Sequence, residues 1–279
     1  MNKQETSLGI HAPLIVIMLF QIAALFCRSF LQMELTTAGF EQEFAKNLSY
    51  LVVPVIEIAL LWPILKQNRK ALLILLRLPA RWPRIFLRAA LLGLLARLSG
   101  WSVLITATAF GWFDFSPPGQ GNGPWLWFAC PPPPMLLLGL LVTVVLIPPG
   151  EEIINRGLIL GQIARRNRNG AVVTSAALFA ILHNPEGMAA AFAIGIMLAI
   201  QTFRTGSLLP SMVTHATYNF LRVVDWYCLH AVWNPEIQTN ASTAVGAGSM
   251  VVGALAFGVA IWICVRSGSE RLTRPDPNQ

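Results

Sequence analysis

Residues 135–164 read MLLLGLLVTVVLIPPGEEIINRGLILGQIA, and this stretch decides what kind of fold the chain can have. Its only charged residues are Glu151, Glu152 and Arg156. A helix that crosses the hydrocarbon core of a membrane needs about 20 consecutive, mostly apolar residues. The stretch is longer than that, so it predicts a membrane-spanning helix with charged side chains inside it.

The composition of the whole chain also indicates a membrane protein. Of its 279 residues, 55% are apolar and only 12% are charged. Soluble domains carry about 25% charged residues, because a chain in water needs a polar surface. The net charge of +7 does not indicate nucleic-acid binding, since the basic residues lie between apolar runs, where membrane topology explains them.

Other apolar runs predict the rest of the architecture. With 135–164 they make eight predicted spans, at residues 10–27, 48–65, 85–110, 135–164, 171–183, 187–203, 207–224 and 246–265. The run at 171–183 is short, and the Asn184-Pro185 pair after it predicts a tight turn at membrane depth. We therefore predict an all-α fold, a polytopic membrane helical bundle in which residues 1–279 form a single domain.

Basic residues alternate from one side of the predicted bundle to the other. They gather after the second, fourth, sixth and eighth spans, as Lys66, Arg69, Lys70, Arg77, Arg81 and Arg84, then Arg165, Arg166 and Arg168, then Arg204, and finally Arg266, Arg271 and Arg274. The loops between these clusters are acidic or nearly neutral. Because basic loops stay inside, this pattern predicts that both termini are cytoplasmic, and the compact loops favour a bacterial plasma membrane.

Two segments between the spans have features of their own. Residues 71–78 are too few to span, and they predict an amphipathic helix on the cytoplasmic face, with its arginines on anionic lipid headgroups. Residues 116–134 are rich in Pro, Gly and Trp, and they predict an irregular outer loop.

The charges inside the fourth span need partners or a purpose, because a charge at the bilayer centre costs about 2.5–3.5 kcal/mol on insertion scales. Glu152 and Arg156 are four residues apart, so they share a helix face and can pair. Glu151 is rotated by about 100° from Glu152 and has no local partner. Pro148-Pro149-Gly150 before it predicts an opened backbone that could admit water.

Two more spans carry polar side chains at helical spacing. Phe179 and His183 are four residues apart in the fifth span, as are His215 and Asn219 in the seventh. A carboxylate can accept a proton from water, an imidazole can orient or donate, and an amide can stabilise an oxyanion. Together with Glu151, these residues predict hydrolytic chemistry, although taken singly each could be a structural hydrogen-bonding group.

The three motifs resemble those of a known family. Glu151-Glu152-x-x-x-Arg156, Phe179-x-x-x-His183 and His215-x-x-x-Asn219 are similar, in this order, to the motifs of the CAAX protease and bacteriocin-processing family (CPBP, Abi or Rce1-like) of intramembrane endopeptidases. The resemblance covers about residues 136–222, and it implies an eight-helix fold with an intramembrane polar cavity.

The resemblance also implies a role for each motif residue. Glu151 would activate the attacking water with help from His183, while His215 and Asn219 would bind the oxyanion. Structural support for the site would come from Glu152, Arg156 and Phe179. One departure is Asn155, where the family usually has Phe before the arginine, and we interpret this as a changed packing position.

The sequence leaves three alternatives open. A glutamate and two histidines resemble a zinc site, but the sequence lacks the HExxH motif, so we favour a mechanism without a metal or another cofactor. A non-catalytic immunity or interaction protein could bind a peptide in the same cavity. A transporter would show internal repeats or paired broken helices, which we do not find. The predicted partners are a peptide or membrane-protein substrate and the lipid bilayer, without nucleic acid.

Overall fold

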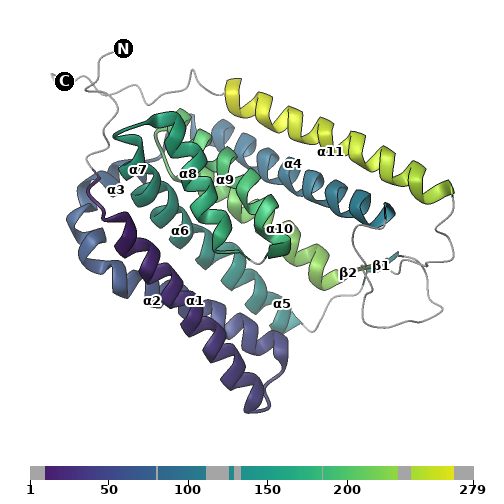
Figure 1. Cartoon of the computed structure of the whole chain (residues 1–279), viewed down its shortest axis with the longest axis horizontal. Helices are drawn as coiled ribbons and strands as arrows, with labels where there is room; N and C mark the ends of the chain where they lie inside the picture. The colour runs from purple at the N-terminus through teal and green to yellow at the C-terminus, as the bar shows by residue number, and fades with distance from the viewer. Residues whose placement is uncertain are drawn as a thin grey trace.

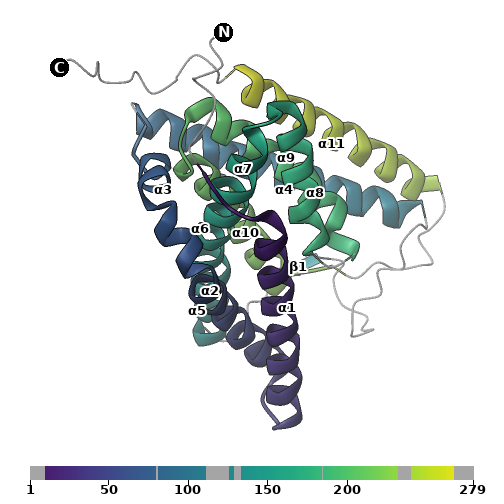
Figure 2. The same ribbon diagram turned by 60° about the vertical axis from the view of Figure 1, so that its left-hand side comes forward.

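The computed structural model of the chain describes residues 10–79, 81–110, 126–128, 133–183, 185–231 and 240–266. Its helices form one bundle, with the α1–α2 hairpin on one side and the α4–α11 pair on the other (Figures 1 and 2). The elements are α1 (Leu14–Thr37), α2 (Gln42–Gln67), α3 (Arg69–Leu75), α4 (Trp82–Ala109), β1 (Leu126–Phe128), α5 (Pro133–Leu140), η2 (Leu141–Leu146), α6 (Ile147–Glu152), η3 (Ile153–Ile159), α7 (Leu160–Ala164), α8 (Arg168–Ile181), α9 (Pro185–Thr205), α10 (Leu209–Cys228), β2 (Leu229–Ala231) and α11 (Asn240–Arg266).

The predicted all-α membrane fold is confirmed. Each of the eight predicted spans is helical, and among the described residues six helices are long and apolar enough to cross a membrane. The other two are α8 and α10. With 14 residues, α8 rises about 21 Å, less than the roughly 30 Å of the hydrocarbon core. Helix α10 has 20 residues, but its polar side chains lower its hydropathy.

The two segments between spans are only partly as predicted. The amphipathic segment contains α3, which begins two residues earlier than the predicted 71–78. In the predicted outer loop, Leu126–Phe128 forms β1, which pairs in antiparallel register with β2 (Leu126 opposite Ala231). The rest of that loop, up to the start of α5 at Pro133, lies outside the described residues.

Small residues bring α4 and α10 into close contact. A Cβ added at Gly93 of α4 would lie 2.6 Å from the backbone oxygen of Thr214 and 2.7 Å from Cβ of Thr217. Close approach at small residues is typical of membrane helix pairs, where helices pack without a hydrophobic driving force. The hydroxyl of Thr214 also donates to the backbone oxygen of Ala89 at 2.9 Å and lies 3.0 Å from Oε1 of Gln201 in α9. These contacts fix α10, which carries His215 and Asn219.

The first and last helices have their outer ends on the same side of the bundle. The start of α1 and the end of α11 lie toward the end of the bundle where α3 and α7 are found (Figures 1 and 2). A chain that crosses a membrane an even number of times has both of its ends on the same side.

Candidate active site

The fourth span is one long helix whose middle is wound more loosely than an α-helix. Two π-helical segments, η2 and η3, flank the short α6 that carries Glu151 and Glu152. π-Helical turns are rare in proteins, and those that occur are often found at functional sites. Before α6, the N–H of Ile147 donates to the oxygen of Val142, five residues back. The next donor in that pattern would be Pro148, which has no N–H, so the carbonyl of Thr143 is left without a donor in its own helix.

Asn219 of α10 supplies that donor. Its Nδ2 donates to the oxygen of Thr143 at 2.8 Å. The side-chain amide carries two hydrogens on this nitrogen, so this bond orients the group and leaves one N–H for another acceptor. Thr143 is a site residue that sequence reasoning missed, although the missing donor at Pro148 was a usable signal.

Glu152 is the fully buried centre of the site. Its Oε2 lies 3.5 Å from Nε of Arg156, which confirms the pair predicted from their spacing. Its Oε1 lies 3.1 Å from Nδ1 of His215. A carboxylate can only accept, so Nδ1 of His215 donates, and Nε2 is the ring nitrogen that faces away from Glu152.

Arg156 is held from three sides. Besides Glu152, its Nη2 donates to the backbone oxygen of Gly195 in α9 at 3.3 Å, and its Cζ lies 4.4 Å from the centroid of the Phe179 ring. Gly195 leaves room for this contact, because a Cβ at this position would lie 3.0 Å from Cα of Ala176 and 3.4 Å from Nη2 of Arg156. Sequence reasoning missed this glycine, since nothing local distinguishes it from other small residues in α9.

The ring of Phe179 contacts both imidazoles. Its ring centroid is 4.6 Å from that of His183 and 5.9 Å from that of His215. Nδ1 of His183 lies 2.9 Å from the backbone oxygen of Phe179, one turn earlier in α8, so it donates there. The ring of His183 is thereby fixed with Nε2 available as an acceptor. His183 therefore joins the cluster through Phe179.

Glu151 is the least enclosed carboxylate of the cluster. Its side chain is 31% exposed, against 0% for Glu152, and its Oε2 lies 3.7 Å from Nε2 of His215. Within the described part of the chain, no donor makes a hydrogen bond to this buried oxygen. The group thus keeps an acceptor free beside an imidazole.

Asn155 makes hydrogen bonds through both its side chain and its backbone. It is buried, and its Nδ2 donates to the backbone oxygen of Glu151 at 2.9 Å, while its own backbone oxygen accepts from the hydroxyl of Ser175 at 3.2 Å. Our interpretation of Asn155 as a packing position was incomplete, because an amide at this point can reach the carbonyl one turn back.

A third acidic residue lies near the site. Glu57 of α2 is buried, and it is close enough to Glu151 for the two charges to interact. Helix α2 packs against α6 and η2, and Pro54 lies 3.9 Å from the position that a Cβ on Gly150 would occupy.

Among the residues that the structure describes, no three His, Cys, Asp or Glu side chains are grouped so that they could hold a metal ion. Glu152 and Nδ1 of His215 are also engaged with each other.

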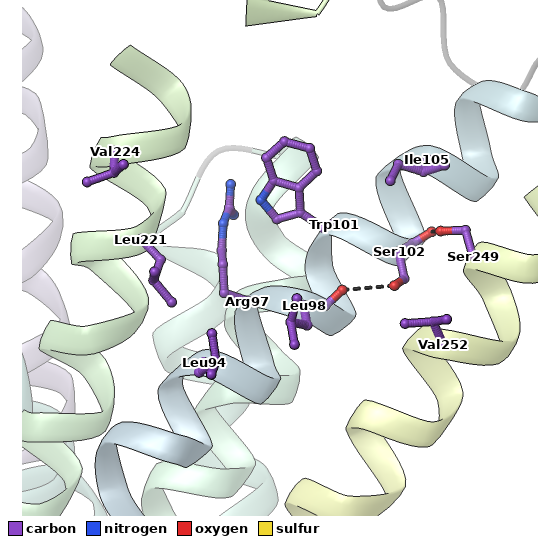
Figure 3. A pocket seen from close by; sticks show the side chains of 10 residues that line it. All are labelled: Leu94, Arg97, Leu98, Trp101, Ser102, Ile105, Leu221, Val224, Ser249 and Val252. Atoms are coloured by element: carbon purple, nitrogen blue, oxygen red, sulfur yellow. Dashed lines mark hydrogen bonds between the residues drawn. The ribbon is translucent and has the colours of Figure 1, made fainter. Parts of the chain in front are cut away.

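The pocket in Figure 3 is separate from this cluster. It has a volume of about 510 Å³ and lies between α4, α10 and α11, lined by Leu94, Arg97, Leu98, Trp101, Ser102, Ile105, Leu221, Val224, Ser249 and Val252. Leu221 follows Asn219 by two residues, so it lies about 200° around the helix. The pocket therefore opens on the face of α10 opposite Asn219.

Comparison with known families bears directly on the cluster. Residues 133–221 match the family model described as type II CAAX prenyl endopeptidase Rce1-like. The predicted resemblance is confirmed. This Rce1-like segment runs from the start of α5 into α10 and contains all seven predicted site residues. No curated protein matches the chain.

Proposed function

We propose that the chain is an intramembrane endopeptidase of the CAAX type, in which Glu151 activates water to hydrolyse a peptide bond. The observation that carries this proposal is the arrangement around His215, with Glu152 at 3.1 Å from one ring nitrogen and Glu151 at 3.7 Å from the other. The Rce1-like match supports the same reaction class.

In the proposed reaction, Glu151 takes a proton from water as the water oxygen bonds to the scissile carbonyl carbon. His183, fixed by its bond to the Phe179 carbonyl, orients this water. The C–N bond then breaks, and the proton on Glu151 passes to the leaving amine. Atoms and charges balance without another reactant.

His215 and Asn219 stabilise the negative oxygen that forms in this reaction. Because Nδ1 of His215 is bonded to Glu152, Nε2 is the ring nitrogen that can donate a hydrogen bond to this oxygen when it carries a proton. The second N–H of Asn219 donates to the same oxygen.

The substrate is a peptide that reaches the site within the membrane, and the family description names prenylated CAAX substrates. We place the protein in a bacterial plasma membrane with both termini cytoplasmic, on the basis of its basic loops. The proposed mechanism uses no metal.

Cleavage assays in reconstituted membranes test the proposal. Purified protein would be given a fluorogenic peptide with a C-terminal prenylated cysteine motif, and the same peptide without the prenyl group. We expect Glu151→Gln and His183→Ala to reduce the rate by at least about 100-fold, the scale of lost general-base catalysis. Glu41→Gln, which changes an exposed acid, is the matched control.

The proposal fails if Glu151→Gln cleaves as fast as the wild type. If the wild type cleaves no peptide while a cellular phenotype survives Glu151→Gln, the site binds a peptide without hydrolysing it. Loss of activity on chelation with recovery on zinc addition would instead require a metal mechanism.

A further inference from the structure

The segment that joins α2 to α4 presents a distinct surface, which we call the α3 surface. It combines six exposed cations with four exposed large apolar side chains and contains no acidic residue between positions 66 and 84. These residues are Lys66, Arg69, Lys70, Arg77, Arg81 and Arg84, with Leu73, Ile74, Leu78 and Trp82.

The position of this surface is at the boundary between lipid and water. It connects the end of one candidate span to the start of the next, and α3 lies at the end of the bundle where α1 begins (Figures 1 and 2). At such a boundary, exposed Leu, Ile and Trp side chains enter the outer acyl region, while Lys and Arg reach headgroups.

The opposite side of the same segment is built into the active-site helices. Leu72 and Leu75 are buried, and a Cβ on Gly157 of η3 would lie 2.8 Å from Cδ2 of Leu72. Arg156, which holds Glu152, is the residue just before Gly157. The α3 segment therefore packs directly on the π-helical turn η3, which carries Arg156.

Two hydrogen bonds also join this segment to the beginning of α10. The N–H of Leu208 donates to the backbone oxygen of Leu75 at 2.7 Å, and the hydroxyl of Ser207 donates to the backbone oxygen of Arg77 at 3.0 Å. Helix α10 begins at Leu209 and carries His215 two turns later. The α3 segment thus contacts both η3 and the start of α10, the two elements whose side chains Arg156 and His215 meet at Glu152.

We propose that the α3 surface is a binding site for anionic phospholipid headgroups, and that the bound lipid stabilises the packing of η3 and α10. Charge complementarity selects an anionic partner. The exposed apolar side chains among the cations select a lipid over an acidic soluble peptide. This inference does not depend on peptidase activity.

Lipid retention measures the proposed site directly. Protein would be reconstituted in nanodiscs that contain phosphatidylcholine and phosphatidylglycerol, and the lipids kept after transfer to detergent would be counted by native mass spectrometry. The test variant is Lys70→Gln/Arg77→Gln, which leaves the backbone bond of Arg77 intact. The control is Arg166→Gln/Arg222→Gln, which removes the same charge from exposed positions outside the α3 surface.

We expect the wild type and the control to retain phosphatidylglycerol severalfold over phosphatidylcholine, and the test variant to lose this preference. Phosphatidylglycerol should also raise the unfolding temperature of the wild type and the control, but not that of the test variant. Equal unfolding temperatures of all three in phosphatidylcholine alone would show that folding is unchanged.

Equal retention by the two variants, or equal retention of the two lipids by the wild type, would overturn the proposal. Displacement of the retained lipid by a soluble acidic peptide would show that the surface binds protein instead. Since no readout involves cleavage, a failure here is distinguishable from a failure of the proposed peptidase activity.

Discussion

At the scale of single residues, the site depends on how each buried charge is compensated. Glu152 and Arg156 are both fully buried, so each needs the other. Breaking a buried pair by removing one partner leaves an uncompensated charge and costs about 3–5 kcal/mol, whereas replacing both partners with apolar groups can be nearly neutral.

Arg156→Met should therefore unfold more easily, by about 3–5 kcal/mol, and should be inactive. The double variant Glu152→Leu/Arg156→Met should regain much of this stability but remain inactive, because His215 has lost the carboxylate that orients it. Thermal unfolding in detergent and the cleavage assay measure the two effects. A double variant as unstable as Arg156→Met would contradict our view of the pair.

Asn155 supports a second residue-scale prediction. Asn155→Leu keeps the approximate size of the side chain but removes its hydrogen bond to the backbone of Glu151. We expect a loss of about 1 kcal/mol in stability and a reduced cleavage rate with little change in KM, because the position of Glu151 changes rather than substrate binding. An unchanged rate would mean that the bond has no part in positioning Glu151.

At the scale of elements, the prolines of α6 decide which groups reach the site. Pro148 has no N–H, so the carbonyl of Thr143 accepts a hydrogen bond from Asn219 of α10 instead. A missing backbone hydrogen bond in one helix thereby fixes a side chain on another. The site is therefore coupled to the π-helical winding of the fourth span.

Pro148→Ala should release Asn219. The new N–H can donate to Thr143 within the helix, and we expect the cleavage rate to fall by about 10-fold or more as an oxyanion donor is lost, while the fold remains stable. Pro63→Ala, at an exposed proline inside α2, is the control and should leave the rate unchanged. If both variants behave alike, the release of Asn219 is not the cause.

The contact between α4 and α10 gives another element-scale prediction. Gly93→Ala should destabilise the protein by about 1–3 kcal/mol through overpacking, since the added Cβ would lie 2.6 Å from the Thr214 backbone oxygen. Gly100→Ala in the same helix would meet only the Tyr218 hydroxyl at 3.8 Å and should be tolerated. Unfolding temperatures compare the two, and equal values would refute the close approach.

At the scale of the whole molecule, hydrophobic length and charge determine the fold, and both can be read from the sequence. The helices at the eight predicted spans were predictable because each contains a run of apolar residues. The pairing of Glu152 with Arg156 was predictable because it is local. The contact of His215 with Glu152, 63 residues away, and that of Arg156 with Gly195 were not, because they depend on how distant helices pack.

Topology is a prediction at this same scale. A reporter that is active only in the cytoplasm should be active when fused to either terminus, because the basic loops adjoin the same side as both ends. The same reporter in the loop at Gly39, between α1 and α2, should be inactive. Activity at Gly39 but at neither terminus would invert the predicted orientation.

The short helix α8 has a consequence for the surrounding bilayer. His183 lies just past the end of a helix that rises about 21 Å, so this part of the protein does not match the full thickness of the hydrocarbon. Local thinning of the bilayer is one response to such a mismatch, and it would bring bulk water closer to His183, which we propose orients the attacking water. Acyl-chain length would then act on hydrolysis by changing how far water must travel to His183.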